Sequence, residues 1–363
     1  MSKRADRQSN IELLRIFAAC GVIILHYNNA KIGGGYAAVE DGSLNQGIMT
    51  FFELLFICAV NLYVLISGYF MRSSMKRDLL KPIELLAQLF VFELLFCLIK
   101  ELPKGNGITF TTLLSYFTPS YWFVFVYIAL YLVSPYVNLV WKSLDDRKKK
   151  VLLSILLGLF SIYPLITDII QYHYDEDILG NSPVGLLGSQ EGYTIVVFVL
   201  MYLIGCFLKD LDDKKTSFKQ GVLVGLLALN IFGLFGWTYL EKFISGKKIF
   251  ATTAIMYENP FVISAAVIIF LIFKNMKMGS NKVINKLATA SFPAYLIHIN
   301  LLEYCGIERF VKENPFLLVG HIIGSTLVIY LISFVIYMVY DLVTRPLFNL
   351  IDKKWKNRRK YEV

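Results

Sequence analysis

Residues 11–29 read IELLRIFAACGVIILHYNN, a mostly apolar stretch with one arginine near its start and one histidine near its end. An α-helix needs about 20 such residues to cross the hydrocarbon of a bilayer. A cleaved secretory signal does not fit, because the stretch carries Arg15 and His26 and lacks a small-residue cleavage site. Residues 11–29 therefore predict a transmembrane helix.

Further apolar blocks of similar length follow, separated by charged or polar stretches. The chain has 363 residues, of which 56% are hydrophobic and 17% charged, whereas soluble domains are about a quarter charged. We expect an all-α, polytopic transmembrane bundle of about ten helices, forming one integral membrane domain over residues 1–363. The expected helices are 11–29, 46–71, 82–100, 121–141, 151–171, 193–208, 220–240, 257–273, 289–305 and 315–341.

The distribution of lysine and arginine predicts the orientation. With the N-terminus inside, the inward segments hold 27 of the 36 basic residues and the outward loops hold eight. Cytosolic loops of membrane proteins carry such an excess. We therefore expect both termini in the cytosol and a multi-pass protein of the plasma membrane. The same bias accounts for the net charge of +9, so no nucleic-acid partner is expected. The inward segments are 1–10, 72–81, 142–150, 209–219, 274–288 and 342–363.

All the cysteines lie inside the expected helices. They are Cys20, Cys58, Cys97, Cys206 and Cys305. An odd number of cysteines, buried in apolar blocks, argues against a disulfide framework and against a metal site. We expect them to be packing residues, and we expect no bound metal.

Two ionisable residues share one face of the first expected helix. Arg15 and His26 are eleven residues apart, which brings them within roughly 20° of the same face and separates them by ~16 Å along the axis. Glu12 lies close enough to pair with Arg15. Alone, Arg15 would suit an interfacial anchor and His26 a hydrogen-bonded packing residue. Ionisable groups inside membranes usually face a bundle interior or an aqueous cavity, so the shared face favours a functional site.

Four segments, in order, resemble the acyltransferase 3 family of membrane-bound O-acyltransferases. The first is the Arg15–His26 pair with ten residues between. The others are AVNLYVLISGYF at 59–70, YWF at 121–123 with Tyr127, Tyr131 and Ser134-Pro135, and SFPAYLIH at 291–298. Together they span nearly the whole chain. One departure concerns an Arg-x-x-Arg element that the family often carries after its second helix, because residues 72–82 read RSSMKRDLLKP here.

The resemblance implies acyl transfer, usually of acetyl, from cytosolic acetyl-CoA to a hydroxyl of a cell-envelope or exopolysaccharide sugar. A sugar hydroxyl is a poor nucleophile, and histidine is the usual general base for it. His26 is therefore the expected catalytic group, either as that base or as a covalent carrier of the acyl group. Arg15 is expected to stabilise charge on the donor phosphate or the thioester carbonyl.

The donor carries several phosphates and cannot enter the hydrocarbon, so its head needs a cationic surface on the cytosolic side. Arg72, Lys76, Arg77 and Lys81 supply one in the loop after the second expected helix. The other interpretation of these four residues is that they act only as topology signals.

Further polar and aromatic residues are candidates for the cavity or the acceptor site: Glu53, Asn61, Ser67, Trp122 and His298. Glu53 lies at a depth comparable to His26 and either orients the imidazole or pairs with an outer lysine. Asn61 and Ser67 also suit helix contacts, and Trp122 also suits an interfacial aromatic belt. We expect His321 to be structural and His173, beside three acidic residues, to be solvated.

A transporter of a small polar solute or glycan precursor is the alternative class, because intramembrane arginine and histidine suit either function. Against it, the sequence has no convincing inverted repeat and no paired helices broken by Gly or Pro. Consumption of a thioester separates the two classes, because an acyltransferase consumes it and a transporter does not.

Overall fold

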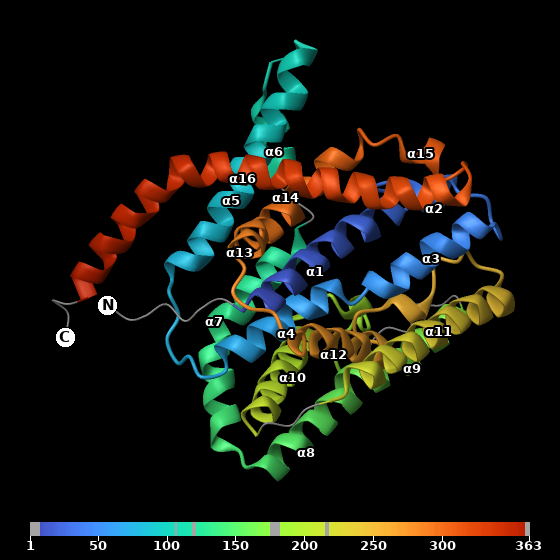
Figure 1. Ribbon diagram of the computed structural model, residues 1–363, viewed down its shortest axis with the longest axis horizontal. Coiled ribbons are helices and arrows are strands. Elements are labelled where there is room, and N and C mark those ends of the chain that lie inside the picture. Colours follow the sequence, from blue (N-terminus) through green and yellow to red (C-terminus); the bar gives the residue numbers. More distant parts are fainter. Residues whose placement is uncertain (1–7, 106, 118–120, 175–181, 215–217, 360–363) are drawn as a thin grey trace.

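The computed structural model describes residues 8–105, 107–117, 121–174, 182–214 and 218–359, and every regular element within them is helical. At the centre lies α1 (Ser9–Asn28), the dark blue helix of Figure 1. It contacts helices from both halves of the chain: α3 and α4 from the first half, and α12, α14 and α16 from the second. Fourteen of its 20 residues are buried, so the first predicted helix forms the core of the bundle.

The second predicted helix consists of two pieces, α3 (Leu44–Phe56) and α4 (Ala59–Met71), with a short turn at Ile57 and Cys58 between them. Neither proline nor glycine marks this break in the sequence. Beyond it, the amide of Asn61 donates to the carbonyl of Tyr257 at 2.9 Å. This bond ties the start of α4 to the loop before α12.

Helix α4 packs closely against α10 (Ile195–Asp213). A Cβ atom built on Gly68 would overlap the carbonyl oxygen of Tyr202, and one built on Gly205 would overlap that of Leu65. Glycine at both positions therefore lets the two backbones touch. Gly68, in the run Ser67-Gly68-Tyr69, therefore has a packing role in this structure.

Three long segments surround this core: α5 (Leu80–Glu101), α7 (Trp122–Ser143) and the continuous run from α8 (Asp146–Leu157) to α9 (Tyr163–Tyr174). A π-helical turn over Gly158–Ile162 joins α8 to α9. Pro164 is the second residue after this turn and has no N–H to donate, so a widened turn accommodates the missing bond. The end of α5 and the short α6 (Phe110–Phe117) project beyond the other helices at the top of Figure 1.

The second half of the chain supplies α11 (Gln220–Ser245), α12 (Pro260–Lys274), α14 (Ser291–Leu302) and α16 (Pro315–Arg359). In Figure 1, α16 is the long red helix that extends past the others. It is 45 residues long and continues well past residue 341, where the prediction ended it. The short elements are α2 (Gly35–Ala38), η1 (Leu102–Lys104), η3 (Gln190–Gly192), η4 (Thr253–Ile255), α13 (Lys282–Leu287), η5 (Ala288–Ala290) and α15 (Ile307–Phe310).

The all-helical membrane prediction is confirmed. Within the described residues, eight helical segments are long and apolar enough to cross a membrane. The other two predicted spans, 193–208 and 289–305, coincide with α10 and α14, which have 19 and 12 residues. The molecule is therefore a multi-pass membrane protein.

Candidate functional site

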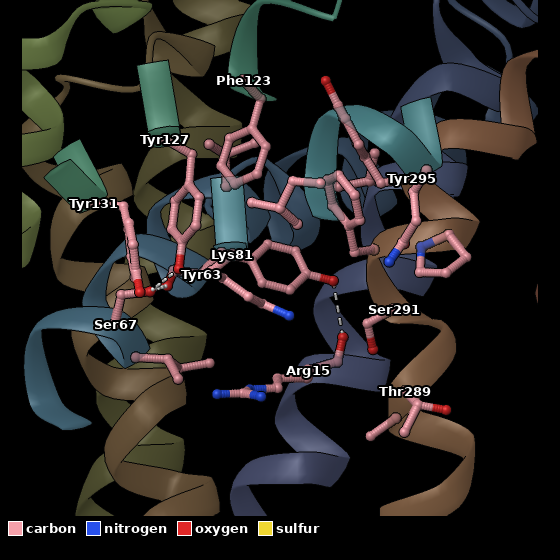
Figure 2. Close-up of a pocket in the computed structure, with 18 of the residues that line it drawn as sticks. Arg15, Tyr63, Ser67, Lys81, Phe123, Tyr127, Tyr131, Thr289, Ser291 and Tyr295 are labelled. Carbon is pink, nitrogen blue, oxygen red and sulfur yellow. Dashed lines mark hydrogen bonds between the residues drawn. The ribbon is translucent and has the colours of Figure 1, made fainter. Parts of the chain in front are cut away.

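A cavity of about 410 Å³ lies between α1, α4, α5, α7 and α14. Its volume falls within the usual range of small-molecule pockets, about 300–1,000 Å³. Its lining includes Glu12, Arg15, Val22, Tyr63, Ser67, Lys81, Gln88, Phe123, Tyr127, Tyr131, Thr289, Ser291 and Tyr295. Figure 2 shows Arg15 and Lys81 reaching into the same space from different elements.

The polar end of the cavity holds two cations. Arg15 is loosely paired with Glu12 at 3.7 Å and keeps 39% of its side chain exposed. Lys81, at the start of α5, pairs with Glu84 at 3.0 Å and is also exposed. Because the Arg15–Glu12 pair is loose and the Lys81–Glu84 pair is solvated, they restrain the cations only weakly. This end suits an anionic group.

Hydroxyl groups line the wall of the cavity. The Tyr63 hydroxyl donates to the backbone carbonyl of Arg15 at 3.0 Å, and Ser67 bonds the Tyr127 hydroxyl at 3.0 Å (Figure 2). About two turns along α5 from Lys81, the side-chain oxygen of Gln88 is buried without a hydrogen-bond partner in the described part of the chain. The sequence predicted Ser67 as a possible cavity residue. It did not predict that Gln88, Tyr63 and Tyr127 would form a polar wall beside it.

The opposite end is apolar and aromatic, and Val22, Phe123 and Tyr295 line it. The rings of Phe123 and Tyr295 lie 5.4 Å apart between centroids, and the rings of Tyr295 and His298 lie 6.0 Å apart. His298 follows Tyr295 by three residues on α14, and His26 follows Val22 by four residues on α1, so each shares a helix face with its lining residue. The two histidines therefore lie one helical turn beyond the lining residues at this end.

His26 and His298 contact each other although 272 residues separate them. Nδ1 of His26 forms a hydrogen bond with Nε2 of His298, and the two rings lie within 7° of parallel. Nδ1 of His298 is in turn 3.1 Å from the carbonyl oxygen of Ala294, one turn back on α14. His298 is fully buried, whereas His26 keeps some accessible surface.

Of the four loop cations, only Lys81 lines the cavity. Arg72 forms an ion pair with Asp210, which also binds Lys149 at 2.8 Å and the indole of Trp141 at 3.1 Å. This network joins the end of α4 to α7, α8 and α10.

Arg77 is held against α7. Its guanidinium donates to the hydroxyl of Ser134 at 2.7 and 2.9 Å and to the carbonyl of Tyr131 at 3.2 Å. Lys76 is exposed and is not among the cavity residues. The donor-binding role predicted for this loop therefore has direct geometric support only at Lys81.

The other candidates lie outside this cavity. Glu53 accepts a hydrogen bond from Asn28 at 2.9 Å, which is neither of the partners considered from the sequence. The amide of Asn61 is used in the bond to Tyr257. Trp122 lies in an aromatic cluster with Tyr193, 4.5 Å between ring centroids.

Two histidines lie apart from the pair. Nδ1 of His321 and the Tyr27 hydroxyl form a hydrogen bond at 2.8 Å. The His321 ring stacks on Phe310 with 3.7 Å between the ring centroids, and both contacts suit a structural residue. His173 is exposed at the end of α9. All five cysteines are free, and no group of three or more His, Cys, Asp or Glu side chains in the described residues has the arrangement of a metal site.

Residues 8–350 match the model of a protein family described as an acyltransferase domain, the acyltransferase 3 family. The match covers almost the whole chain, so this protein belongs to the acyltransferase 3 family. No curated protein and no solved structure matches the sequence. Family membership makes the protein a membrane acyltransferase, which needs an acyl donor and an acceptor, and it does not favour the transporter alternative.

Proposed function

We propose that this enzyme transfers an acetyl group from cytosolic acetyl-CoA to a hydroxyl of a cell-envelope or exopolysaccharide sugar, with His26 as the catalytic residue. The observation that carries the proposal is the single cavity that begins at Arg15 and Lys81 and ends one helical turn short of His26. Acyl transfer from a long, polyanionic donor needs both ends: cations for the phosphates and a base at the reacting carbonyl.

The cavity matches the chemistry of such a donor along its length. The nucleotide head stays at the polar end, where Arg15 and Lys81 can contact phosphate oxygens. The pantetheine arm is thin and carries amides, and the unpaired oxygen of Gln88 offers an acceptor for one amide N–H. The thioester then points toward the aromatic end and the histidine pair.

His26 performs the transfer by general-base catalysis or by covalent catalysis. In the first route, the acceptor hydroxyl gives its proton to His26, and its oxygen attacks the thioester carbonyl carbon. The carbon–sulfur bond breaks, and the leaving CoA thiolate takes the proton back from His26. In the second route, the imidazole nitrogen attacks the thioester carbonyl carbon, the carbon–sulfur bond breaks, and CoA leaves as a thiolate from an acyl-imidazolium. The acceptor oxygen then attacks the acyl carbon, the carbon–nitrogen bond to His26 breaks, and the hydroxyl proton goes to the thiolate.

Two measurements test the proposal. Purified protein with acetyl-CoA and envelope polysaccharide from a strain lacking this gene should release free CoA and move labelled acetyl into the glycan. His26→Ala should reduce both by at least about 100-fold, the scale of a lost general base, while the protein accumulates normally. An intact thioester with every glycan tried would contradict the acetyl-CoA assignment, and full activity of His26→Ala would exclude His26.

Labelled acetyl-CoA without an acceptor separates the two routes. A covalent intermediate leaves label on the wild-type protein and none on His26→Ala. Direct transfer leaves both proteins unlabelled.

A further inference from the structure

The contact between His26 and His298 joins α1 to α14 beyond the aromatic end of the cavity. Their rings are nearly parallel, and a nitrogen of one contacts a nitrogen of the other, so the imidazoles meet edge to edge in an N–H···N hydrogen bond. One nitrogen must donate and the other must accept. Which of them carries the proton decides which nitrogen of His26 is free to react.

The backbone of α14 fixes this choice. Nδ1 of His298 lies 3.1 Å from the carbonyl oxygen of Ala294, and a carbonyl oxygen can only accept. Nδ1 of His298 therefore carries a hydrogen, and a neutral imidazole carries only one. Nε2 of His298 is then bare and accepts from His26. It follows that Nδ1 of His26 holds its hydrogen and that Nε2 of His26 has the free lone pair.

Exposure agrees with this assignment. His298 is fully buried and both of its ring nitrogens have partners. His26 retains accessible surface, and its Nε2 has no hydrogen-bond partner within the described ranges. The inner histidine is therefore saturated, and the outer one presents a basic nitrogen.

We propose that His298 is a positioning residue that holds His26 in the tautomer with its reactive lone pair on Nε2. This inference rests on the proposed function, in which His26 is the catalytic group. When Nε2 takes the proton of the acceptor hydroxyl, His26 becomes a cation, and its Nδ1–H bond to His298 becomes charge-assisted. The pair stabilises that cation until the leaving thiolate removes the Nε2 proton. On the covalent route the same lone pair attacks the thioester.

A purely packing role for His298 is the competing explanation, and two substitutions of similar length separate it from positioning. His298→Gln keeps an oxygen that can accept from Nδ1 of His26, whereas His298→Met fills similar space without such an acceptor. We expect kcat to fall by about 100-fold or more in His298→Met and clearly less in His298→Gln. The KM for acetyl-CoA should stay within about twofold of wild type in both, because His298 does not line the donor cavity.

His321→Gln is the matched control. His321 is also a helical histidine with a ring-nitrogen hydrogen bond and an aromatic neighbour, but it bonds Tyr27 and not His26. Its variant should keep kcat within about twofold of wild type. Equal kcat in His298→Met and His298→Gln, or a loss confined to KM, would overturn the positioning role.

A spectroscopic measurement tests the tautomer without activity. The chain has only four histidines, so ¹⁵N-histidine labelling gives a spectrum that single substitutions can assign. Wild type should show His26 and His298 both protonated at Nδ1, and His26 should become a tautomer mixture in His298→Met. His26 protonated at Nε2 in wild type would refute the inference even if acyl transfer is confirmed. Failure of the proposed function would appear separately, as an absence of thioester consumption.

Discussion

At the scale of single residues, Arg15 has two separable roles. Its backbone carbonyl accepts from Tyr63, and its side chain lines the cavity with 39% exposure and a loose pair to Glu12. Such a loose pair, with a partly exposed cation, contributes at most about 1 kcal/mol to stability. Substitution of the side chain should therefore affect donor binding more than folding.

Arg15→Ala should raise the KM for acetyl-CoA at least about tenfold, because a charge-assisted contact to phosphate or carbonyl oxygen is lost. Arg15→Lys should recover part of this loss if charge alone suffices, and none if a two-point contact is needed. Arg345→Ala is the control and should change KM little, because Arg345 is also in a local ion pair, with Asp341, but does not line the cavity. Steady-state kinetics with varied acetyl-CoA give the answer, and an unchanged KM in Arg15→Ala would contradict the donor role.

The sequence predicted part of this site from helical geometry alone. A separation of eleven positions places Arg15 and His26 on one face, and a separation of three positions allows Glu12 and Arg15 to form their ion pair. The contact of His26 with His298 could not be derived, because helix rotation in a bundle depends on packing between distant segments. The same reason explains why Glu53 accepts a hydrogen bond from Asn28, whereas the sequence suggested His26 or an outer lysine as its partner.

At the scale of elements, two cations of the loop after α4 have different surroundings. Lys81 lines the cavity, whereas Arg77 donates to Ser134 and to the carbonyl of Tyr131 on α7. Lys81→Met should raise the KM for acetyl-CoA severalfold and leave thermal stability near wild type. Arg77→Met should lower thermal stability, because buried acceptors lose their donor. Melting curves and donor kinetics on both variants test this division, and the reverse pattern would contradict it.

The contact between α4 and α10 gives a sharper test of packing. Gly68→Ala adds a methyl group where a Cβ overlaps the Tyr202 carbonyl, so the helices must separate. We expect a loss of at least about 2 kcal/mol in unfolding free energy. Gly225→Ala on α11 is the control, since nothing lies within 4 Å of its Cβ, and it should be neutral or slightly stabilising. Equal stability of the two variants would contradict the close approach.

Element boundaries show where hydropathy is informative and where it is not. The apolar blocks located the helices, because the bilayer fixes both their length and their polarity. Pro164 is a visible cause for the π-helical turn before it. The break at Ile57 and Cys58 has no such signal. The extension of α16 to Arg359 is rich in charged residues, so an apolar window ends too early.

At the scale of the whole molecule, orientation links the fold to the proposed donor. The cavity has its cations at one end and its histidine pair beyond the other, so the cation end must face the compartment that holds acetyl-CoA. The 27-to-8 distribution of basic residues predicts that this end, with the loop after α4, is cytosolic. Charge distribution and cavity polarity thus make the same prediction, and Lys81 contributes to both.

Single cysteines introduced in a cysteine-free variant test the orientation. Glu40 and Ser73 are both exposed and lie on either side of the segment Leu44–Met71. In intact cells, Glu40→Cys should react with a membrane-impermeant maleimide, and Ser73→Cys should react only after the membrane is opened. The reverse pattern would place Arg15 and Lys81 outside, away from cytosolic acetyl-CoA, and the donor assignment would fail with it. Reaction of both from outside would instead show that residues 44–71 do not cross the membrane, which would overturn the depths assigned to His26 and His298.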